Sequence, residues 1–339
     1  MTRTPLASRT HDAPPPFRTG RGRALLRILA IASCLPYLSL KAAWIAGSHI
    51  GIPDGSVLLD HPTLMAVANS GTVLMDGTVI VLALLLTQAW GRRVRAWLLA
   101  LPMWVATGLL LPIMAGFPLQ LLVGALTGRS PGADDSRAFL DDWVFTVVYP
   151  GFIVQGLTLG TLFVLYARDR WGHLWRSALR DLPPSPTAPA LRAAAVAASV
   201  LAVVPATMHL AWAAGSTAGL NGTRIAERTD DFYALQALDA LFVAAAVAGV
   251  LLLAFRRTGG LALEVPLALA WAGSGTVACS GGWLSIASLG SVEEIADHPT
   301  AAMGLIYAVQ MLVGMLIVTS GAYFFAERSA AAKSAGTRA

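Results

Sequence analysis

Long apolar runs constrain the fold of this chain more than any other feature of its sequence. A helix needs about 20 apolar residues to cross the hydrocarbon core of a bilayer. Only 13% of the residues are charged, against about a quarter in a soluble domain, and 56% are hydrophobic. Runs of the required length cover residues 24–47, 63–90, 96–116, 142–167, 192–214, 232–255, 263–284 and 300–325. The sequence therefore predicts an all-α, polytopic integral membrane protein with eight transmembrane helices.

The distribution of arginine predicts the orientation of these helices. Arginines precede the first predicted span and follow the second, fourth, sixth and eighth, whereas the other loops hold most of the acids. Because loops rich in Lys and Arg remain in the cytoplasm, both termini are predicted to be cytoplasmic. Alanine and arginine richness indicates a GC-rich bacterial genome, and hence the bacterial inner membrane. The net charge of +5 is then explained by the orientation of the helices in the membrane. It does not indicate nucleic-acid binding, which needs arginines clustered on one face, because the arginines here are spread over several short loops.

The sequence also repeats itself. Residues 41–48 (KAAWIAGS) return as residues 209–216 (HLAWAAGS), and an aspartate precedes a double arginine at similar spacing in both halves. With four spans in each copy, both copies start on the same side, so they are predicted to be parallel four-helix repeats. The predicted organisation is a disordered cytoplasmic tail (1–22), the first repeat (23–170), a semi-extended Pro-rich cytoplasmic linker (171–191), the second repeat (192–326) and a disordered cytoplasmic tail (327–339).

Each predicted repeat buries a base on its first helix and an acid on its second. At about 1.5 Å of rise per residue, these groups all lie roughly 24–27 Å from the cytoplasmic boundary, in the outer third of the membrane. Adjacent antiparallel helices usually touch, so we expect Lys41 to pair with Asp76 and His209 with Asp239. Amide side chains stand nearby at Asn69 and Gln236. Ionisable groups inside a membrane are by default candidates for a functional site.

Two interpretations of this polar layer stay open. If the pairs only hold helices together, the protein is a non-catalytic membrane component, such as a partner subunit or a sensor. The other interpretation is a small-solute or ion transporter with its site between the repeats. It is favoured by predicted breaks in the third span of each repeat, at Pro112 and at the glycines of 273–275 and 281–282. Histidine changes its charge near neutral pH, so the second repeat would be the proton-coupling one; a neutral histidine with one hydrogen bond is the alternative.

A third hypothesis places an external metal site, and with it a membrane enzyme, at two Asp-His-Pro-Thr segments. Its ligands would be Asp60, His61, Asp297 and His298, because imidazole and carboxylate suit zinc. Helix capping explains the same residues, since Asp and Pro are both favoured at helix starts. The chain has no nucleotide-binding loop, and we expect no serine and histidine close enough to hydrogen-bond as a catalytic nucleophile and its base. The sequence thus predicts no cofactor and favours a protein that is not an enzyme.

Overall fold

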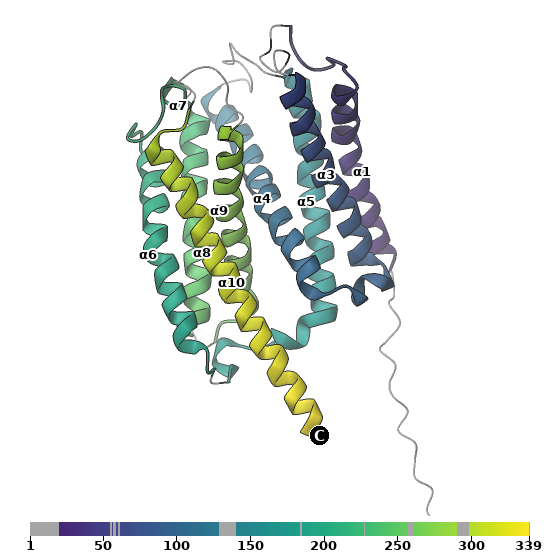
Figure 1. The fold of residues 1–339 in the computed structure, drawn as a ribbon, viewed down its shortest axis with the longest axis vertical. Helices are drawn as coiled ribbons and strands as arrows, with labels where there is room; N and C mark the ends of the chain where they lie inside the picture. Colours follow the sequence, from purple (N-terminus) through teal and green to yellow (C-terminus); the bar gives the residue numbers. More distant parts are fainter. Residues whose placement is uncertain are drawn as a thin grey trace, which may run out of the picture.

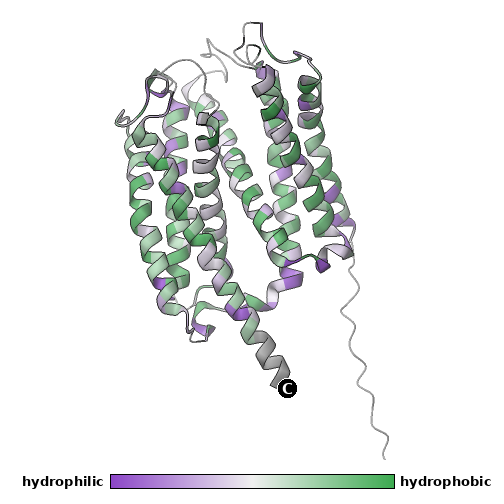
Figure 2. Ribbon diagram, viewed as in Figure 1, coloured by the Kyte–Doolittle hydropathy of each residue, from purple (hydrophilic) through white to green (hydrophobic). Residues whose placement is uncertain are grey.

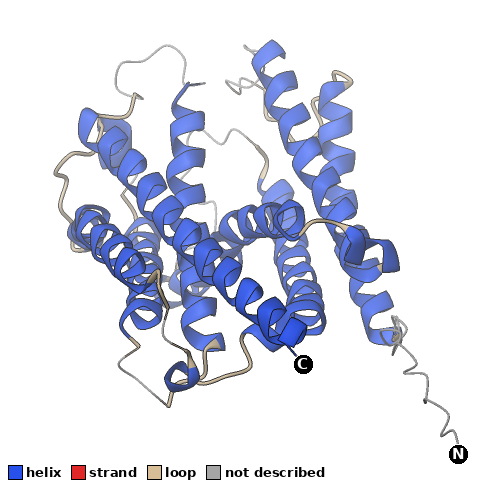
Figure 3. Cartoon of the chain, turned by 60° about the horizontal axis from the view of Figure 1, so that its bottom comes forward, coloured by secondary structure: helices blue, strands red, loops and turns tan. Residues whose placement is uncertain are grey.

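The protein is helical throughout the part of the chain that the structure describes. The computed structural model describes residues 20–54, 56, 59, 62–128, 140–183, 185–226, 228–256, 260–289 and 298–338. Figure 3 shows helices and loops but no strand among these residues, where the one contact of β type is an isolated bridge between Ala178 and Ala262. The long helices are α1 (Arg21–Ile45), α3 (Pro62–Thr87), α4 (Ala96–Thr127), α5 (Asp142–Trp171), α6 (Ala188–Ala213), α8 (Asp230–Phe255), α9 (Glu264–Leu289) and α10 (Ala301–Arg338). The all-α prediction is confirmed.

Seven of the long helices among the described residues are apolar enough to cross a membrane: α1, α3, α4, α5, α6, α8 and α10. Figure 2 shows apolar residues along these helices and hydrophilic residues gathered near their ends. Side chains such as Leu74 and Leu126 are 73% and 77% exposed, which suits contact with lipid. The chain is therefore a multi-pass membrane protein. The remaining predicted span, 263–284, is the seventh in chain order and coincides with α9, which is long enough but less apolar.

The helices run up and down in one bundle (Figure 1). In the first half of the chain, α1 packs against α3 and α5, and in the second half α6, α8, α9 and α10 pack in a ring. Helix α4 lies between the halves, where it contacts α5 on one side and α8 and α9 on the other. Helix α1 starts and helix α10 finishes at the same end of the bundle, which we call the terminal end. The opposite end is the distal end.

Helix α9 is the most enclosed of the long helices, and its glycines explain how. A Cβ on Gly273 would come within 2.4 Å of the backbone nitrogen of Ala246 on α8. One on Gly281 would come within 2.4 Å of the Tyr307 carbonyl oxygen on α10, and one on Gly275 within 3.1 Å of the Trp104 carbonyl oxygen on α4. Each neighbouring helix thus meets α9 at a glycine, as is usual for close packing in membranes.

The prediction that the third span of each half is broken is wrong. Helix α9 is continuous from Glu264 to Leu289, because its glycines serve close packing rather than a break. Helix α4 is continuous from Ala96 to Thr127 and contains Pro112 within it.

The segment between the halves is packed against the terminal end of the second half. It contains η2 (Gly172–Leu174) and η3 (Leu179–Asp181), and Leu179 is buried. Its backbone bonds to the residues just before α9, where Leu179 N donates to Leu261 O at 3.0 Å. Ser185 and Thr187 both donate to the carboxylate of Glu327 on α10, at 2.6 and 2.7 Å. Helix α10 itself continues to Arg338, well past the expected span end at 325, where a disordered tail was predicted.

Candidate functional site

The repeated KAAWIAGS and HLAWAAGS segments fold into the same turn at the distal end of the bundle. The indole nitrogen of Trp44 donates to the carbonyl of Ile50 at 2.7 Å, and that of Trp212 donates to Ala218 at 2.9 Å. Gly47 and Gly215 follow each helix with φ angles of +88° and +92°, which a side chain rarely adopts. The basic residue of each segment, Lys41 or His209, therefore lies about one helical turn before the end of α1 or α6.

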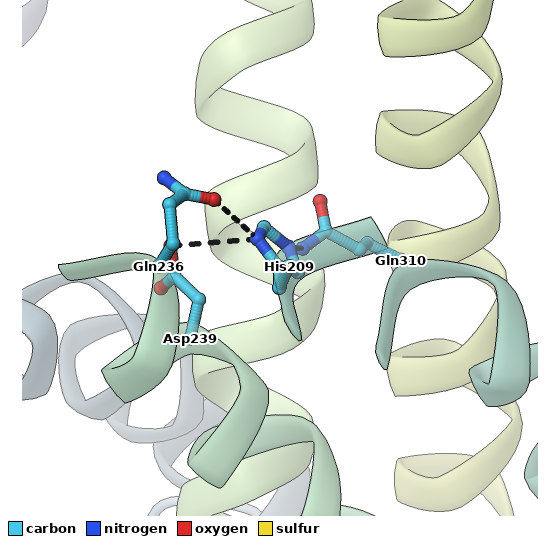
Figure 4. Close-up of polar contacts among 4 residues, drawn as sticks. All are labelled: His209, Gln236, Asp239 and Gln310. Carbon is cyan, nitrogen blue, oxygen red and sulfur yellow. Dashed lines mark hydrogen bonds and ion pairs between the residues drawn. The ribbon is translucent and has the colours of Figure 1, made fainter. Parts of the chain in front are cut away.

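In the second half, the base is His209, and its ring is held between two glutamines (Figure 4). The ring Nδ1 lies 2.7 Å from Gln236 Oε1 on α8, and the ring Nε2 lies 2.9 Å from Gln310 Nε2 on α10. Asp239 approaches from the same side as Gln236, with its Oδ2 3.9 Å from Nδ1. The predicted approach of His209 to Asp239 is observed, although Gln236 is the closer partner.

The two glutamines assign a proton to one ring nitrogen. Gln236 presents an oxygen, so Nδ1 is the donor, and Gln310 presents its NH₂ group, so Nε2 is the acceptor. In this arrangement both ring nitrogens of His209 have a hydrogen-bond partner. The oxygen of Gln310 has no hydrogen-bond partner among the described residues. A rotation of this amide by about 180° would present that oxygen to Nε2 and accommodate a protonated ring.

In the first half, the base is Lys41, and it does not reach Asp76. Its Nζ donates to Asn69 Oδ1 at 2.8 Å and lies 4.8 Å and 4.6 Å from the ring centroids of Tyr37 and Trp44. Asp76 instead accepts a hydrogen bond from Gln155 Nε2 on α5, at 3.2 Å from Oδ1. Of the described residues, none forms an ion pair with either Lys41 or Asp76. The expected pairing in this half is therefore wrong, because Asn69 lies closer to the lysine.

We call Lys41, Asn69, Asp76 and Gln155 the first cluster. It leaves three buried polar atoms without a hydrogen-bond partner among the described residues. They are Asn69 Nδ2, Asp76 Oδ2 and Gln155 Oε1. The side chains are well shielded, since Asn69 and Asp76 are each 4% exposed and Gln155 is 1% exposed. An unsatisfied buried polar group costs about 1–3 kcal/mol, so such groups point to a missing water, ion or ligand.

The structure separates the residues that the sequence placed in one layer. One cluster lies among α1, α3 and α5 and the other among α6, α8 and α10, so neither lies between the halves. The acids also differ in depth. Asp76 is seven residues beyond Asn69, whereas Asp239 is three beyond Gln236, a difference of about 6 Å along the helix. The glutamines at 155 and 310 were missing from the predicted site, although both occupy the fourth span of their half.

Between the halves lies a contact of a different kind, where α4 crosses α9. Trp104 donates to Ser274 at 3.0 Å, and Trp271 donates to Thr107 at 3.2 Å. The two sequences at the crossing are alike, WVATG at 104–108 and WAGSG at 271–275. Each tryptophan thus bonds to the hydroxyl residue of the other segment, which gives the crossing a reciprocal pattern. This short repeated motif was not recognised in the sequence.

The external metal candidates are only partly visible. Asp60, His61 and Asp297 lie outside the described residues, and the carbonyl of His298 accepts a hydrogen bond from Asn221 at 3.3 Å. Within the described part of the chain, no three His, Cys, Asp or Glu residues lie close enough to hold a metal ion.

Comparisons with protein-family models, with curated proteins and with solved structures found no match to this chain.

Proposed function

We propose that this protein moves a small solute or an ion across a bacterial inner membrane, with both termini in the cytoplasm. In this proposal, its two halves are parallel four-helix repeats, and each half holds one polar cluster. The Lys41–Asp76 cluster binds the transported species, and the His209 cluster responds to protons.

Reciprocal contacts support the repeat. The turns that follow α1 and α6, which we call the Trp turns, are each closed by a hydrogen bond from a tryptophan indole, Trp44 or Trp212, to a backbone carbonyl six residues later. Lys41 bonds to an amide on the second helix of its half, and His209 does the same. At the α4–α9 crossing, a single offset of 167 residues relates Trp104 to Trp271 and Thr107 to Ser274. Two copies related by a two-fold axis along the bundle would produce this pattern.

Chain direction supports an eighth span. Helices α8 and α10 both run from the distal end to the terminal end (Figure 1). If both cross the membrane in that direction, the chain between them must return across it. Helix α9 makes that return, and its 26 residues reach about 39 Å, enough to cross the hydrocarbon core.

The observation that carries the transport proposal is the incomplete pairing of the first cluster. A purely structural pair of charges would bring Lys41 and Asp76 together, since separated charges in a membrane are costly. Instead the two groups bind different amides, and Asp76 keeps an oxygen with no hydrogen-bond partner among the described residues. A site that must bind and release a ligand needs such available groups, whereas a structural contact does not.

Proton movement in proteoliposomes tests this function. Purified protein is reconstituted with an internal pH dye, and a potassium diffusion potential drives protons inward. We expect acidification well above that of protein-free liposomes, and at least a tenfold loss in Asp76→Asn and in His209→Gln. Asp230→Asn is the matched control, because Asp230 is an exposed acid in the first turn of α8. Acidification that needs no protein, or that neither substitution slows, would overturn the proposal.

A structural role is the second candidate, and the second cluster favours it. Both nitrogens of His209 are satisfied, as in a contact that only joins helices. Under this alternative, Lys41→Met combined with Asp76→Leu stays folded and keeps any proton movement, since paired replacement of buried charges is often tolerated. A double variant that elutes as a monodisperse peak but moves no protons excludes it.

A further inference from the structure

We propose that the first cluster is a binding site for a small zwitterion, a molecule that carries an ammonium group and an acid group. The ammonium end contacts Asp76 and Gln155, and the acid end contacts Lys41 and Asn69. The inference rests on the proposed function and names the class of its substrate.

The ammonium end follows from two unpaired acceptors. Asp76 Oδ2 and Gln155 Oε1 are both buried and lack a donor among the described residues. They lie near each other, because the same two side chains are joined through Gln155 Nε2 and Asp76 Oδ1 at 3.2 Å. An ammonium group has three N–H donors and a positive charge, so it satisfies both oxygens and the carboxylate charge together.

The acid end follows from two donors, Asn69 about two helical turns from Asp76 on α3 and Lys41 beside it on α1. Asn69 Nδ2 is a buried donor with no partner in the described part of the chain. Lys41 Nζ uses one N–H on Asn69 Oδ1 and retains two others beside the rings of Tyr37 and Trp44. A carboxylate placed here accepts from both residues. These are charge-assisted hydrogen bonds, which are about twice as strong as neutral ones.

Charge balance distinguishes a zwitterion from a simple ion. Lys41 and Asp76 already carry opposite charges, so a cation or anion alone would leave a net charge buried in the membrane. A zwitterion adds no net charge, and its two ends oppose the two protein charges. Asn69 and Asp76 are separated by seven residues, or about 10 Å of helix rise, too far for the lysine bound at Asn69 to pair with Asp76. A molecule with charges at both ends spans that gap.

The second half does not offer the same site. The ring nitrogens of His209 are both occupied by glutamines, and Asp239 lies one turn from Gln236 rather than two. The zwitterion is therefore assigned to the first half alone, and variants of His209 are not expected to affect its binding.

Thermal unfolding of the purified full-length protein in detergent tests the inference. The probes are glycine, β-alanine, γ-aminobutyrate and 5-aminopentanoate, which differ in the distance between their charges. Each is compared with an equimolar mixture of butylamine and butyrate, which supplies the same groups on separate molecules. A ligand that binds only the folded state raises the unfolding temperature. We expect a rise of a few degrees with at least one zwitterion and no comparable rise with the mixture.

Variants locate the binding site, and calorimetry measures the affinity. Asp76→Asn and Lys41→Met should each weaken binding of the active zwitterion at least tenfold, whereas the exposed Asp230→Asn should not. If no zwitterion exceeds the mixture, the first cluster holds water only and the inference is overturned. Binding that persists in both cluster variants also overturns it. A zwitterion-specific shift in a protein that moves no protons even when that zwitterion is added to the liposomes would keep this site and reject the transport proposal instead.

Discussion

Gly108 on α4 lies directly against the backbone of Gly275 on α9. A Cβ on Gly108 would come within 2.3 Å of the Gly275 carbonyl oxygen and within 2.7 Å of Cys279 Sγ, so the two helix backbones approach closely there. Trp104 and Trp271 donate across the same crossing from either side. This crossing joins the two halves, and its closeness depends on the absence of a side chain at both glycines.

Gly108→Ala should loosen the contact between the halves. The new methyl group would meet backbone atoms that cannot move independently, and overpacking of this kind costs about 1–3 kcal/mol. We expect the unfolding temperature in detergent to fall by several degrees. Gly160→Ala on α5 is the control, because a Cβ there meets nothing within 4 Å. Equal behaviour of the two variants would show that the halves do not pack as described.

The reciprocal tryptophans predict matched losses. Trp104→Phe removes the hydrogen bond to Ser274, and Trp271→Phe removes the bond to Thr107, while each retains an aromatic ring. Interhelical hydrogen bonds in membranes contribute about 0.6 kcal/mol on average, so both variants should be destabilised modestly and similarly. A double-mutant cycle of Trp104→Phe with Ser274→Ala should recover this coupling. A coupling of zero would mean that the bond contributes nothing to stability.

The apolar runs predicted all eight long helices, and the one helix less apolar than the other seven is enclosed by its neighbours. Seven predicted spans meet the criterion for a membrane helix in the described residues, because their outer faces need large apolar side chains toward lipid. Helix α9 is enclosed by α4, α8 and α10, so it needs small residues where they approach. Its glycines looked like interruptions in the sequence for that reason. Composition alone does not distinguish a glycine that breaks a helix from one that admits a neighbour.

The structure brings together only one of the two predicted pairs of charged residues. The sequence places Lys41 and Asp76 on adjacent helices, but it does not fix the height of one helix relative to the other. Asn69 and Asp76 are seven residues apart and share one face of α3, so the relative height of α1 and α3 brings Asn69 to the lysine and leaves Asp76 with Gln155 on α5. The two glutamines, Gln155 and Gln310, lie on the fourth span of each half. The order of the helices along the chain does not show that this span lies beside the acid or the base. The one sequence feature that could have identified both glutamines is their matching position in the two halves, where each follows a valine.

The Trp turns should depend on glycine for backbone conformation rather than for space. A Cβ on Gly47 or Gly215 would meet nothing within 4 Å, yet both residues have φ near +90°. An L-residue in a left-handed conformation costs about 1–2 kcal/mol, so Gly47→Ala and Gly215→Ala should each lower stability by that amount. Asn is tolerated better at positive φ, so Gly215→Asn should cost less than Gly215→Ala. The helical Gly282→Ala, which also meets open space, serves as the control.

The hydrogen bonds of His209 predict which ring nitrogen carries its proton. Gln236 Oε1 accepts from Nδ1, and Gln310 Nε2 donates to Nε2, so ¹⁵N NMR of histidine-labelled protein should show a protonated Nδ1 and an unprotonated Nε2. The signal is assigned by its loss in His209→Gln. Gln310→Glu replaces the donor with a carboxylate, which should draw a proton onto Nε2 because a buried carboxylate favours a charged neighbour. A wild-type ring protonated at Nε2 would instead mean that the Gln310 amide faces the other way. In that case its oxygen accepts from the ring, and Asp239, at 3.9 Å, balances the charge if both nitrogens carry protons.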